Sequence, residues 1–278
     1  MALETSEEPD AFRKFERQGW QTNAAGYEAH WGPLVRKTVE PTLEAAGVCA
    51  GMSVLDVCCG PATLTEAACR RGARVVGLDI SSELLELARR KVPEANFHEG
   101  NAEDLPFDEE SFDAVIAGYG LMHVARPDAV LREMLRVLRA DARLAVSVWQ
   151  KPDPSNGFGI LFGAMKQHAD LDVDLPHGPD FFQMGDRELM AAALGEVGVA
   201  DIMTATIQQA WQLDDELGIV RAVMEGAVRA RALLQSQSAE VQAAIDRTVA
   251  EGMQSFRAPD GGYRVPMPAI LGAGRKPT

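Results

Sequence analysis

Between residues 52 and 149 the chain alternates short apolar runs with amphipathic stretches, and this rhythm limits the possible folds most strongly. The apolar runs predict strands over residues 53–57, 73–78, 96–98, 112–117 and 143–149. The intervening stretches have helical spacing and predict helices over residues 62–71 and 129–138, with Ser81 as the N-cap of a third. Short, largely apolar strands that alternate with helices indicate a parallel sheet with both faces covered.

The segments on either side of this core have a different pattern. Residues 11–46 are expected to be helical. After Trp149 we expect helices over residues 158–168 and 187–194, a loop over 169–185, a strand over 200–207, and two helices within 214–253. A final strand is expected within residues 263–273, and its two prolines make it an edge candidate.

This pattern predicts three parts of the chain. Residues 1–46 are expected to form an N-terminal helical cap, and residues 47–150 a ligand-binding core. Residues 151–278 are expected to complete the sheet and to add inserted helices as a lid.

Net charge restricts the ligands and partners. The chain carries 27 Lys and Arg residues against 41 Asp and Glu residues, a formal charge of −14. This charge argues against nucleic acid and against an anionic membrane surface as partners. No apolar run is long enough to span a bilayer, and the first ten residues do not resemble a signal peptide. We therefore expect a cytoplasmic protein with a small-molecule ligand.

The cysteine pattern predicts no metal site. Cys49, Cys58, Cys59 and Cys69 have spacings of neither a zinc site nor a disulfide framework. Reduced, packed cysteines are the expected state.

Acidic residues lie at the ends of the first two predicted strands. Asp56 precedes a turn in which Gly60 is the only glycine, so the full glycine set of a dinucleotide-binding loop is missing. A carboxylate here would disfavour a pyrophosphate and favour a cationic or zwitterionic ligand. Asp79 ends the second strand, where an acidic side chain can accept hydrogen bonds from ribose hydroxyls. A ligand with a ribose, a positively charged amino-acid tail and no phosphate is S-adenosylmethionine.

Four motifs then carry a family resemblance. Residues 54–62 (VLDVCCGPA) resemble the first motif of class I S-adenosylmethionine-dependent methyltransferases, and residues 75–81 (VVGLDIS) resemble the second. Residues 100–107 and 112–115 are similar to the third and fourth. The nearest branch is that of the ubiquinone and menaquinone C-methyltransferases, of the type 11 kind. The resemblance implies an α/β fold, namely a Rossmann-like, doubly wound sheet of seven strands with helical lid insertions.

The resemblance implies residues for the methionine end of the cofactor. Gly60 and its neighbour Cys58 would pass close to the methionine part, with Asp56 beneath the loop, holding either the loop or the ammonium through water. Gly118 would offer its carbonyl to the ammonium, and Tyr27 would close over the carboxylate. Glycine is common in the family at the position of Cys58, and we expect the small cysteine to preserve binding.

For the adenosine end the resemblance implies four further residues. Asp79 would bind the ribose and Ile80 would pack on the adenine. Ala102 would offer backbone groups, and Asn101 a polar side chain, to the adenine edge. Asn101 stands where the family more often has aspartate, and its amide oxygen can still accept a hydrogen bond. No residue is expected to bind a metal.

His123 follows the fourth strand and is the first candidate for a general base, since methyl transfer to a protic group requires removal of a proton. The alternative is a histidine that only lines the pocket. His168 and His177, in the inserted segment, are further candidates to face the acceptor, with exposed surface histidines as the alternative.

The inserted segments favour a hydrophobic acceptor but leave its reacting atom open. Residues 151–185 and 213–258 are rich in Phe and Met, typical of a core or of an apolar acceptor pocket under a lid. The sequence leaves the acceptor atom open among carbon, oxygen, nitrogen and sulfur, and it leaves open whether the protein is a homodimer. A non-catalytic S-adenosylmethionine-binding module that acts through a protein partner is the alternative function. A nicotinamide-dependent dehydrogenase is disfavoured by Asp56 and the incomplete glycine set.

Overall fold

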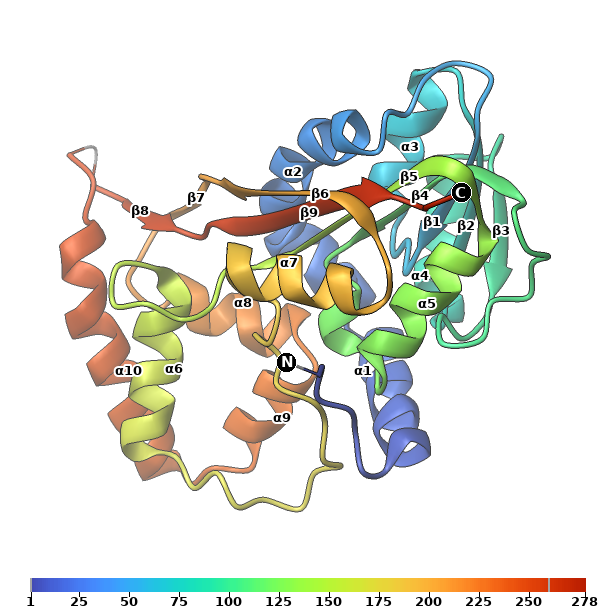
Figure 1. Cartoon of the computed structure of the whole chain (residues 1–278). Coiled ribbons are helices and arrows are strands. Elements are labelled where there is room, and N and C mark those ends of the chain that lie inside the picture. Colours follow the sequence, from blue (N-terminus) through green and yellow to red (C-terminus); the bar gives the residue numbers. More distant parts are fainter. Residues whose placement is uncertain (1, 260) are drawn as a thin grey trace.

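A seven-stranded sheet runs through the molecule with the strand order β3-β2-β1-β4-β5-β9-β6 (Figure 1). The computed structural model describes residues 2–259 and 261–278. The strands of this sheet are β1 (Ser53–Val57), β2 (Arg74–Asp79), β3 (Asn96–Glu99), β4 (Phe112–Gly118), β5 (Leu138–Trp149), β6 (Ala200–Ile207) and β9 (Ala269–Arg275). Strands β1 to β5 pair in parallel, and β9 runs antiparallel to both β5 and β6. The expected Rossmann-like, doubly wound sheet is confirmed.

Helices cover both faces of the sheet because successive strand residues point to opposite sides. Val54 and Ala114 pack in one cluster with α2 and α3, whereas their neighbours Leu55 and Val115 pack in another with α5 and α7. Helix α4 packs along β2 and β3. The bounds of these helices are α2 (Gly32–Ala45), α3 (Thr63–Arg70), α4 (Ser82–Lys91), α5 (Pro127–Val137) and α7 (Arg187–Glu196). Ser81 caps α4 as expected, accepting a hydrogen bond from the Leu84 N–H.

The helices of residues 157–168 and 218–253 lie below the sheet toward the left of Figure 1, whereas the long first helix lies below the sheet further to the right. These elements are α1 (Pro9–His30), α6 (Gly157–His168), α8 (Gly218–Gly226), α9 (Arg229–Gln235) and α10 (Ala239–Met253). Short 3₁₀ turns are η1 (Leu121–His123) and η2 (Gln254–Phe256), and a separate two-stranded ladder pairs β7 (Ala210–Leu213) with β8 (Tyr263–Pro266). No helix within residues 2–259 and 261–278 is long and apolar enough to span a membrane.

Two expectations for the C-terminal part were wrong. The stretch 214–253 holds three helices instead of two, because the chain leaves helical geometry after Gly226 and again at Ser238, whose side chain caps α10. The last segment holds two strands instead of one: β8 is an edge strand of the two-stranded ladder, whereas β9 lies inside the seven-stranded sheet. Pro266 ends β8 and Pro268 precedes β9, so β9 itself contains no proline and can lie between β5 and β6.

The crossing of α1 and α8 depends on glycine, which gives a first prediction. A Cβ atom at Gly26 would lie 2.0 Å from the Glu225 carbonyl oxygen, whereas at Gly163, in α6, it would meet no described atom within 4 Å. We expect Gly26→Ala to lower the free energy of unfolding by ~1–3 kcal/mol through overpacking. Gly163→Ala is expected to raise it by ~0.5–1 kcal/mol through helix propensity. Urea unfolding of both variants measures this, and equal changes would contradict the described crossing.

Candidate active site

A cleft opens at the carboxyl ends of β1, β2 and β4, where the strand order reverses direction and where α/β sheets usually bind ligands. It encloses about 690 Å³, its open mouth included. Apart from Asp56, the sequence-predicted cofactor residues and the candidate base all line this cleft, namely Tyr27, Cys58, Gly60, Asp79, Ile80, Asn101, Ala102, Gly118 and His123. The fold thus brings together residues from α1, from the ends of β1, β2, β3 and β4, and from η1.

The loop after β1 is held tightly against β2. Gly60 donates its N–H to Asp79 Oδ2 at 2.8 Å. The backbone has positive φ at Cys58 (57°), Gly60 (51°) and Ala62 (64°), the left-handed region that favours glycine. Two of these left-handed positions, Cys58 and Ala62, thus carry a residue other than glycine. Gly120 lies against this loop. A Cβ atom at Gly120 would be 2.3 Å from the Cβ of Cys58, so only glycine fits at that position.

Asp79 is the central polar group of the cleft and is only 6% exposed. Besides Gly60, the N–H of Ser81 donates to it, reaching Oδ1 at 2.9 Å. Burial raises the pKa of this carboxyl above its usual value, and the amide hydrogen bonds from Ser81 and Gly60 act in the opposite direction. Each carboxylate oxygen can accept a further hydrogen bond, so Asp79 can still bind hydroxyl donors in the cleft.

Asp56 lies in a smaller adjoining cavity of about 370 Å³, which Tyr27, Cys58 and Gly118 also line. Its Oδ2 accepts a hydrogen bond from the Thr65 hydroxyl at 2.6 Å, while Oδ1 is buried with no hydrogen-bond partner among the described residues. An unpartnered buried carboxylate oxygen is costly unless a cation or water completes it. Burial raises the pKa of Asp56 to about 7.

This raised pKa predicts how stability depends on pH. The unfolded carboxyl titrates near pH ~4, so between about pH 4 and the folded pKa of about 7 the folded state holds the additional proton. The free energy of unfolding should therefore fall as pH rises across this window, by up to ~1.4 kcal/mol per pH unit. Asp56→Asn should lose this contribution to the pH dependence of the free energy of unfolding. Urea unfolding at several pH values measures the difference.

Asp113→Asn is the matched control. Hydrogen bonds from the Ser53 N–H and Arg139 lower the pKa of Asp113, so its titration affects stability below the same window. This variant should keep the wild-type dependence of the free energy of unfolding on pH. If Asp56→Asn also keeps that dependence, the buried carboxyl of Asp56 ionises normally.

The adenosine end of the cleft follows β2 and β3. Ile80 and Leu84 provide apolar walls, and Ala102 is buried. Asn101 differs in detail from the expectation, since its side-chain oxygen accepts a hydrogen bond from the Glu103 N–H at 3.1 Å and so shapes the loop. The NH₂ group of the Asn101 side chain can still donate hydrogen bonds to a ligand.

Helix α1 covers the cleft and contributes residues that the sequence reasoning missed, namely Arg13, Glu16 and Trp20. Arg13 donates to Glu103 Oε2 at 2.8 Å, and Gln21 donates to the Ser82 hydroxyl at 3.3 Å, so the helix is joined to the loops after β3 and β2. These residues, together with Tyr27, recur at helical intervals along one face of α1. This spacing is the sequence feature from which their common face could have been predicted.

His123 sits beside Glu16 in this wall. Its Nδ1 lies 3.1 Å from Glu16 Oε2, and the indole N–H of Trp20 donates to the same oxygen at 3.1 Å. The imidazole packs edge-to-face against Trp20 and Phe181, with ring centroids 4.8 and 5.3 Å apart. The ring is therefore fixed by contacts on two sides.

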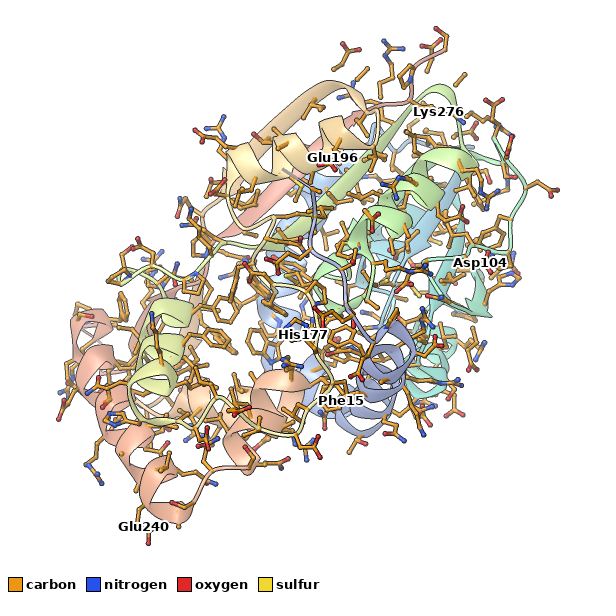
Figure 2. All side chains as sticks on the ribbon, turned by 60° about the horizontal axis from the view of Figure 1, so that its bottom comes forward. Phe15, Asp104, His177, Glu196, Glu240 and Lys276 are labelled. Atoms are coloured by element: carbon orange, nitrogen blue, oxygen red, sulfur yellow. The ribbon has the colours of Figure 1, made fainter. Side chains whose placement is uncertain are left out.

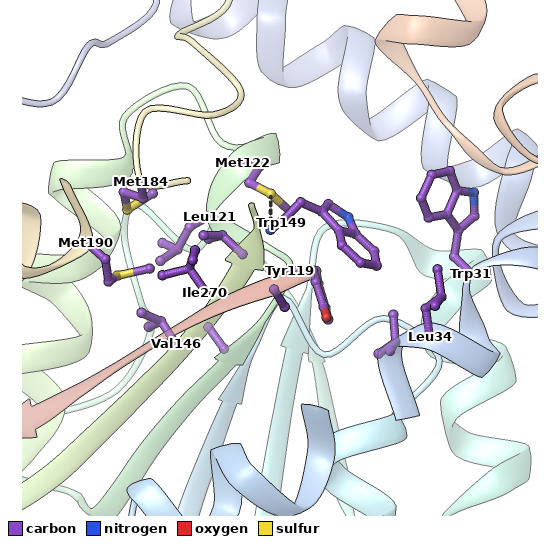
Figure 3. Close-up of a cluster of buried hydrophobic side chains, with 14 of the residues drawn as sticks. Trp31, Leu34, Tyr119, Leu121, Met122, Val146, Trp149, Met184, Met190 and Ile270 are labelled. Atoms are coloured by element: carbon purple, nitrogen blue, oxygen red, sulfur yellow. Dashed lines mark hydrogen bonds between the residues drawn. The ribbon is translucent and has the colours of Figure 1, made fainter. Parts of the chain in front are cut away.

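A second, larger cavity adjoins the cleft, and we call it the aromatic chamber. It encloses about 1180 Å³ and is lined mainly by Phe12, Trp31, Met122, Trp149, Phe158, Phe162, Phe181, Phe182, Val223, Ala230 and Leu233. It shares Glu16, Trp20, Tyr27, Tyr119 and His123 with the cleft. Figure 3 shows Trp149 between Tyr119 and Trp31. The Met122 sulfur accepts a hydrogen bond from the backbone N–H of Trp149.

The other candidate histidines line neither cavity. His168 Nε2 hydrogen-bonds the Thr248 hydroxyl at 2.7 Å, joining α6 to α10. His177 lies on the long loop, where its carbonyl accepts a hydrogen bond from the Ser6 hydroxyl at 2.6 Å (Figure 2). The described part of the chain holds no group of three or more His, Cys, Asp or Glu side chains placed to bind a metal ion.

The charges of the cleft suit S-adenosylmethionine. The hydrogen bonds to Asp56 and Asp79 come from the Thr65 hydroxyl and from backbone N–H groups, not from cationic side chains, and the unpartnered Asp56 Oδ1 could accept from a positive group. Glu103, in contrast, is already paired with Arg13 and Arg126. A ligand with ribose hydroxyls and positive charges fits this lining, while a phosphate-rich ligand would meet repulsion.

Comparisons with known proteins agree with this geometry. Residues 55–146 match the family described as Methyltransferase domain. The demethylmenaquinone methyltransferase of Renibacterium salmoninarum is 39% identical over 127 residues, which are 46% of this chain and 51% of the relative. The chain thus spans about half the length of the curated relatives it matches.

Solved structures share the fold at low sequence identity. The Haemonchus contortus phosphoethanolamine N-methyltransferase 2, in complex with S-adenosyl-L-methionine, has a TM-score of 0.57 at 16% identity, covering 96% of this chain and 60% of that one. The cyclase SpnF has a TM-score of 0.56 at 17% identity, with 100% of both chains covered. Over residues 55–146 the chain therefore carries a methyltransferase domain that resembles those of the quinone methyltransferases, on the fold shared with S-adenosylmethionine-dependent methyltransferases.

Proposed function

We propose that this protein transfers a methyl group from S-adenosylmethionine to a small hydrophobic or aromatic acceptor that binds in the aromatic chamber. The observation that carries this proposal is the wall shared by the cleft and the chamber, which includes Tyr119 and His123. An acceptor in the chamber would lie next to the cofactor. S-adenosylmethionine supplies an electrophilic methyl group, so the chain needs mainly to position the acceptor.

In this proposal different cleft residues bind different parts of the cofactor. Asp79 holds the ribose, Ile80 packs on the adenine, and Asn101 with Ala102 contacts the adenine edge. The methionine end lies over the left-handed loop formed by Cys58 and Gly60, with Gly118, Tyr27 and Asp56 around it. The support is that these residues surround one cleft and its adjoining cavity.

The chain's three parts have distinct roles in this proposal. Residues 1–46 cover the cofactor, residues 47–150 bind it, and residues 151–278 complete the sheet and enclose the acceptor. Support comes from α1, whose residues line the cleft, and from α6, α8 and α9, whose residues line the chamber. The curated relatives act on demethylmenaquinone by name, which favours an acceptor of the quinone type.

A methyl-transfer screen tests the proposal. Purified protein is incubated with S-adenosylmethionine carrying a deuterated methyl group and with phenols, quinols, amines, thiols and prenylated compounds. We expect labelled product with an aromatic or prenylated compound, detected by mass spectrometry. Failure to bind S-adenosylmethionine in calorimetry would overturn the proposal. Binding without turnover, together with a co-purifying protein, would favour the non-catalytic module instead.

A further inference from the structure

Glu16 and His123 form a hydrogen-bonded pair in the wall that separates the cofactor cleft from the aromatic chamber. They are 107 residues apart in the chain, and His123 Nδ1 lies 3.1 Å from Glu16 Oε2. The Glu16 side chain is only 4% exposed. Its carboxylate lies within hydrogen-bond distance of a ring nitrogen of Trp20 and of His123. The pair lines both cavities.

This contact determines which imidazole nitrogen is left for a ligand. A carboxylate only accepts hydrogen bonds, so Nδ1 of His123 carries a proton in this pair. In the neutral imidazole the lone pair is then on Nε2. The edge-to-face contacts with Trp20 and Phe181 fix the ring plane. A carboxylate that fixes the tautomer and stabilises the imidazolium is the arrangement that turns histidine into a general base.

Charge is also placed to support proton uptake by His123. Asp79, at the end of β2, interacts electrostatically with the imidazole, and Glu16 lies against it from α1. Arg229, from α9, lines the chamber and interacts electrostatically with Glu16, and Asp180, from the long loop, also lines the chamber. Arg13 of α1 lines the cleft but is paired with Glu103. Glu16 and Asp79 therefore supply negative charge near the imidazolium that the proton transfer would form.

We propose that His123, with Glu16 as its positioning residue, removes the hydroxyl proton of an aromatic acceptor in the chamber, so that the acceptor class is a phenol or an enol that is methylated on oxygen. This inference rests on the proposed function. The O–H proton moves to Nε2, and an oxygen lone pair forms the bond to the methyl carbon as the carbon–sulfur bond breaks with its electrons going to sulfur. The imidazolium then releases its proton to solvent.

A merely structural Glu16 would be replaceable by glutamine, which keeps the size and the hydrogen-bond acceptor. A buried carboxylate is costly to keep charged unless a cationic group lies near it. Arg229 interacts electrostatically with Glu16, and an imidazolium at His123 would be hydrogen-bonded to it directly. Glu16→Gln therefore separates the two roles, and Glu16→Asp keeps the charge.

The binding test uses para-nitrophenol, whose phenolate is coloured, at a pH below the pKa of the free probe. The protein is loaded with S-adenosylhomocysteine so that no turnover occurs. We expect wild-type protein to bind the probe as the coloured phenolate, with its proton on His123. Glu16→Gln and His123→Gln should bind it as the colourless phenol, and Glu16→Asp should recover part of the colour.

Glu225→Gln is the matched control, because Glu225 pairs with His30 at 2.6 Å and neither residue lines a cavity. It should behave as wild type. A colourless bound probe in wild-type protein, or full colour in Glu16→Gln, would overturn the dyad while leaving the proposed function standing. Absence of probe binding to the loaded wild-type protein would overturn the chamber as the acceptor site, and with it this inference.

A kinetic test follows once an acceptor is known. Glu16→Gln should lower kcat by ~100-fold, as for loss of general-base catalysis, with KM changed much less. The deficit should shrink as pH rises toward the pKa of the acceptor hydroxyl, because solvent then removes the proton. A deficit that is constant with pH would indicate a structural role and contradict the proposal.

Discussion

Replacement of Asp79 by alanine is expected to weaken S-adenosylmethionine binding by ~100-fold or more. The carboxylate is buried, holds the Gly60 and Ser81 N–H groups, and in our proposal also accepts from the ribose. Alanine removes the ribose contact and leaves two backbone donors of the loop unpaired. Hydrogen bonds to a charged group contribute ~1.5–3 kcal/mol each, so the loss of the ribose contact and the loosening of the loop together reach this magnitude.

Calorimetric titration with S-adenosylmethionine measures the effect of Asp79→Ala. The matched control is Asp113→Ala, which removes another carboxylate that accepts a backbone N–H, that of Ser53 at 2.8 Å, at the amino end of the neighbouring strands. The control should lose stability and keep its affinity. Circular dichroism establishes that both variants fold. Unchanged affinity in folded Asp79→Ala would remove the ribose assignment.

Filling the aromatic chamber should abolish turnover without loss of cofactor binding. Ala230, on α9, is half-buried and lines the chamber but not the cleft. We expect Ala230→Trp to lower kcat/KM for the acceptor by ~100-fold or more, because the indole occupies the space that the acceptor needs and any misplacement of the reacting atoms is costly. The affinity for S-adenosylmethionine should stay within a few-fold of wild type.

The matched control for the chamber is Gln235→Trp, which adds the same indole at an exposed position at the end of the same helix. It should retain wild-type turnover and wild-type cofactor affinity. Retention of turnover by Ala230→Trp would place the acceptor outside the chamber. A loss of cofactor affinity as large as the loss of turnover would mean that the two cavities do not bind separate ligands.

The sequence predicted the sheet well because local patterns determine it. The strands over residues 53–57 and 200–207 match β1 and β6 in both bounds. The wrong predictions concern places where tertiary contacts decide. The break after Gly226 depends on close packing against Trp31 and Gly26, and β9 lies inside the sheet because its neighbours β5 and β6 come from distant parts of the chain.

The residues of the candidate site were likewise predictable only in part. The cleft residues from the strand ends were predictable, since their motifs are contiguous and strand ends of a parallel sheet meet at one edge. Asp56 could be placed near the loop, but its separate cavity depends on α2 and α3 packing around it. Glu16 and Trp20 were missed, because nothing local to residues 11–46 reveals that α1 lies over a loop 100 residues away.

The chamber was predicted only in outline. Phe158, Phe162, Phe181 and Phe182 line it as the lid interpretation required, whereas Met165 and Met184 are buried in the core and do not line it. Trp31 and Trp149 also line it, although the periodic pattern gave no reason to separate them from core residues. Only the tertiary packing distinguishes an aromatic side chain in a cavity wall from one in a filled core.

A crystal structure with S-adenosylhomocysteine bound tests directly whether the cleft and the chamber form one active site. We expect the adenosine in the cleft, with its ribose hydroxyls on Asp79, and the sulfur facing the chamber between Tyr119 and His123. A nucleoside that occupies the aromatic chamber, or a sulfur that faces away from it, would show that the two cavities do not form one active site.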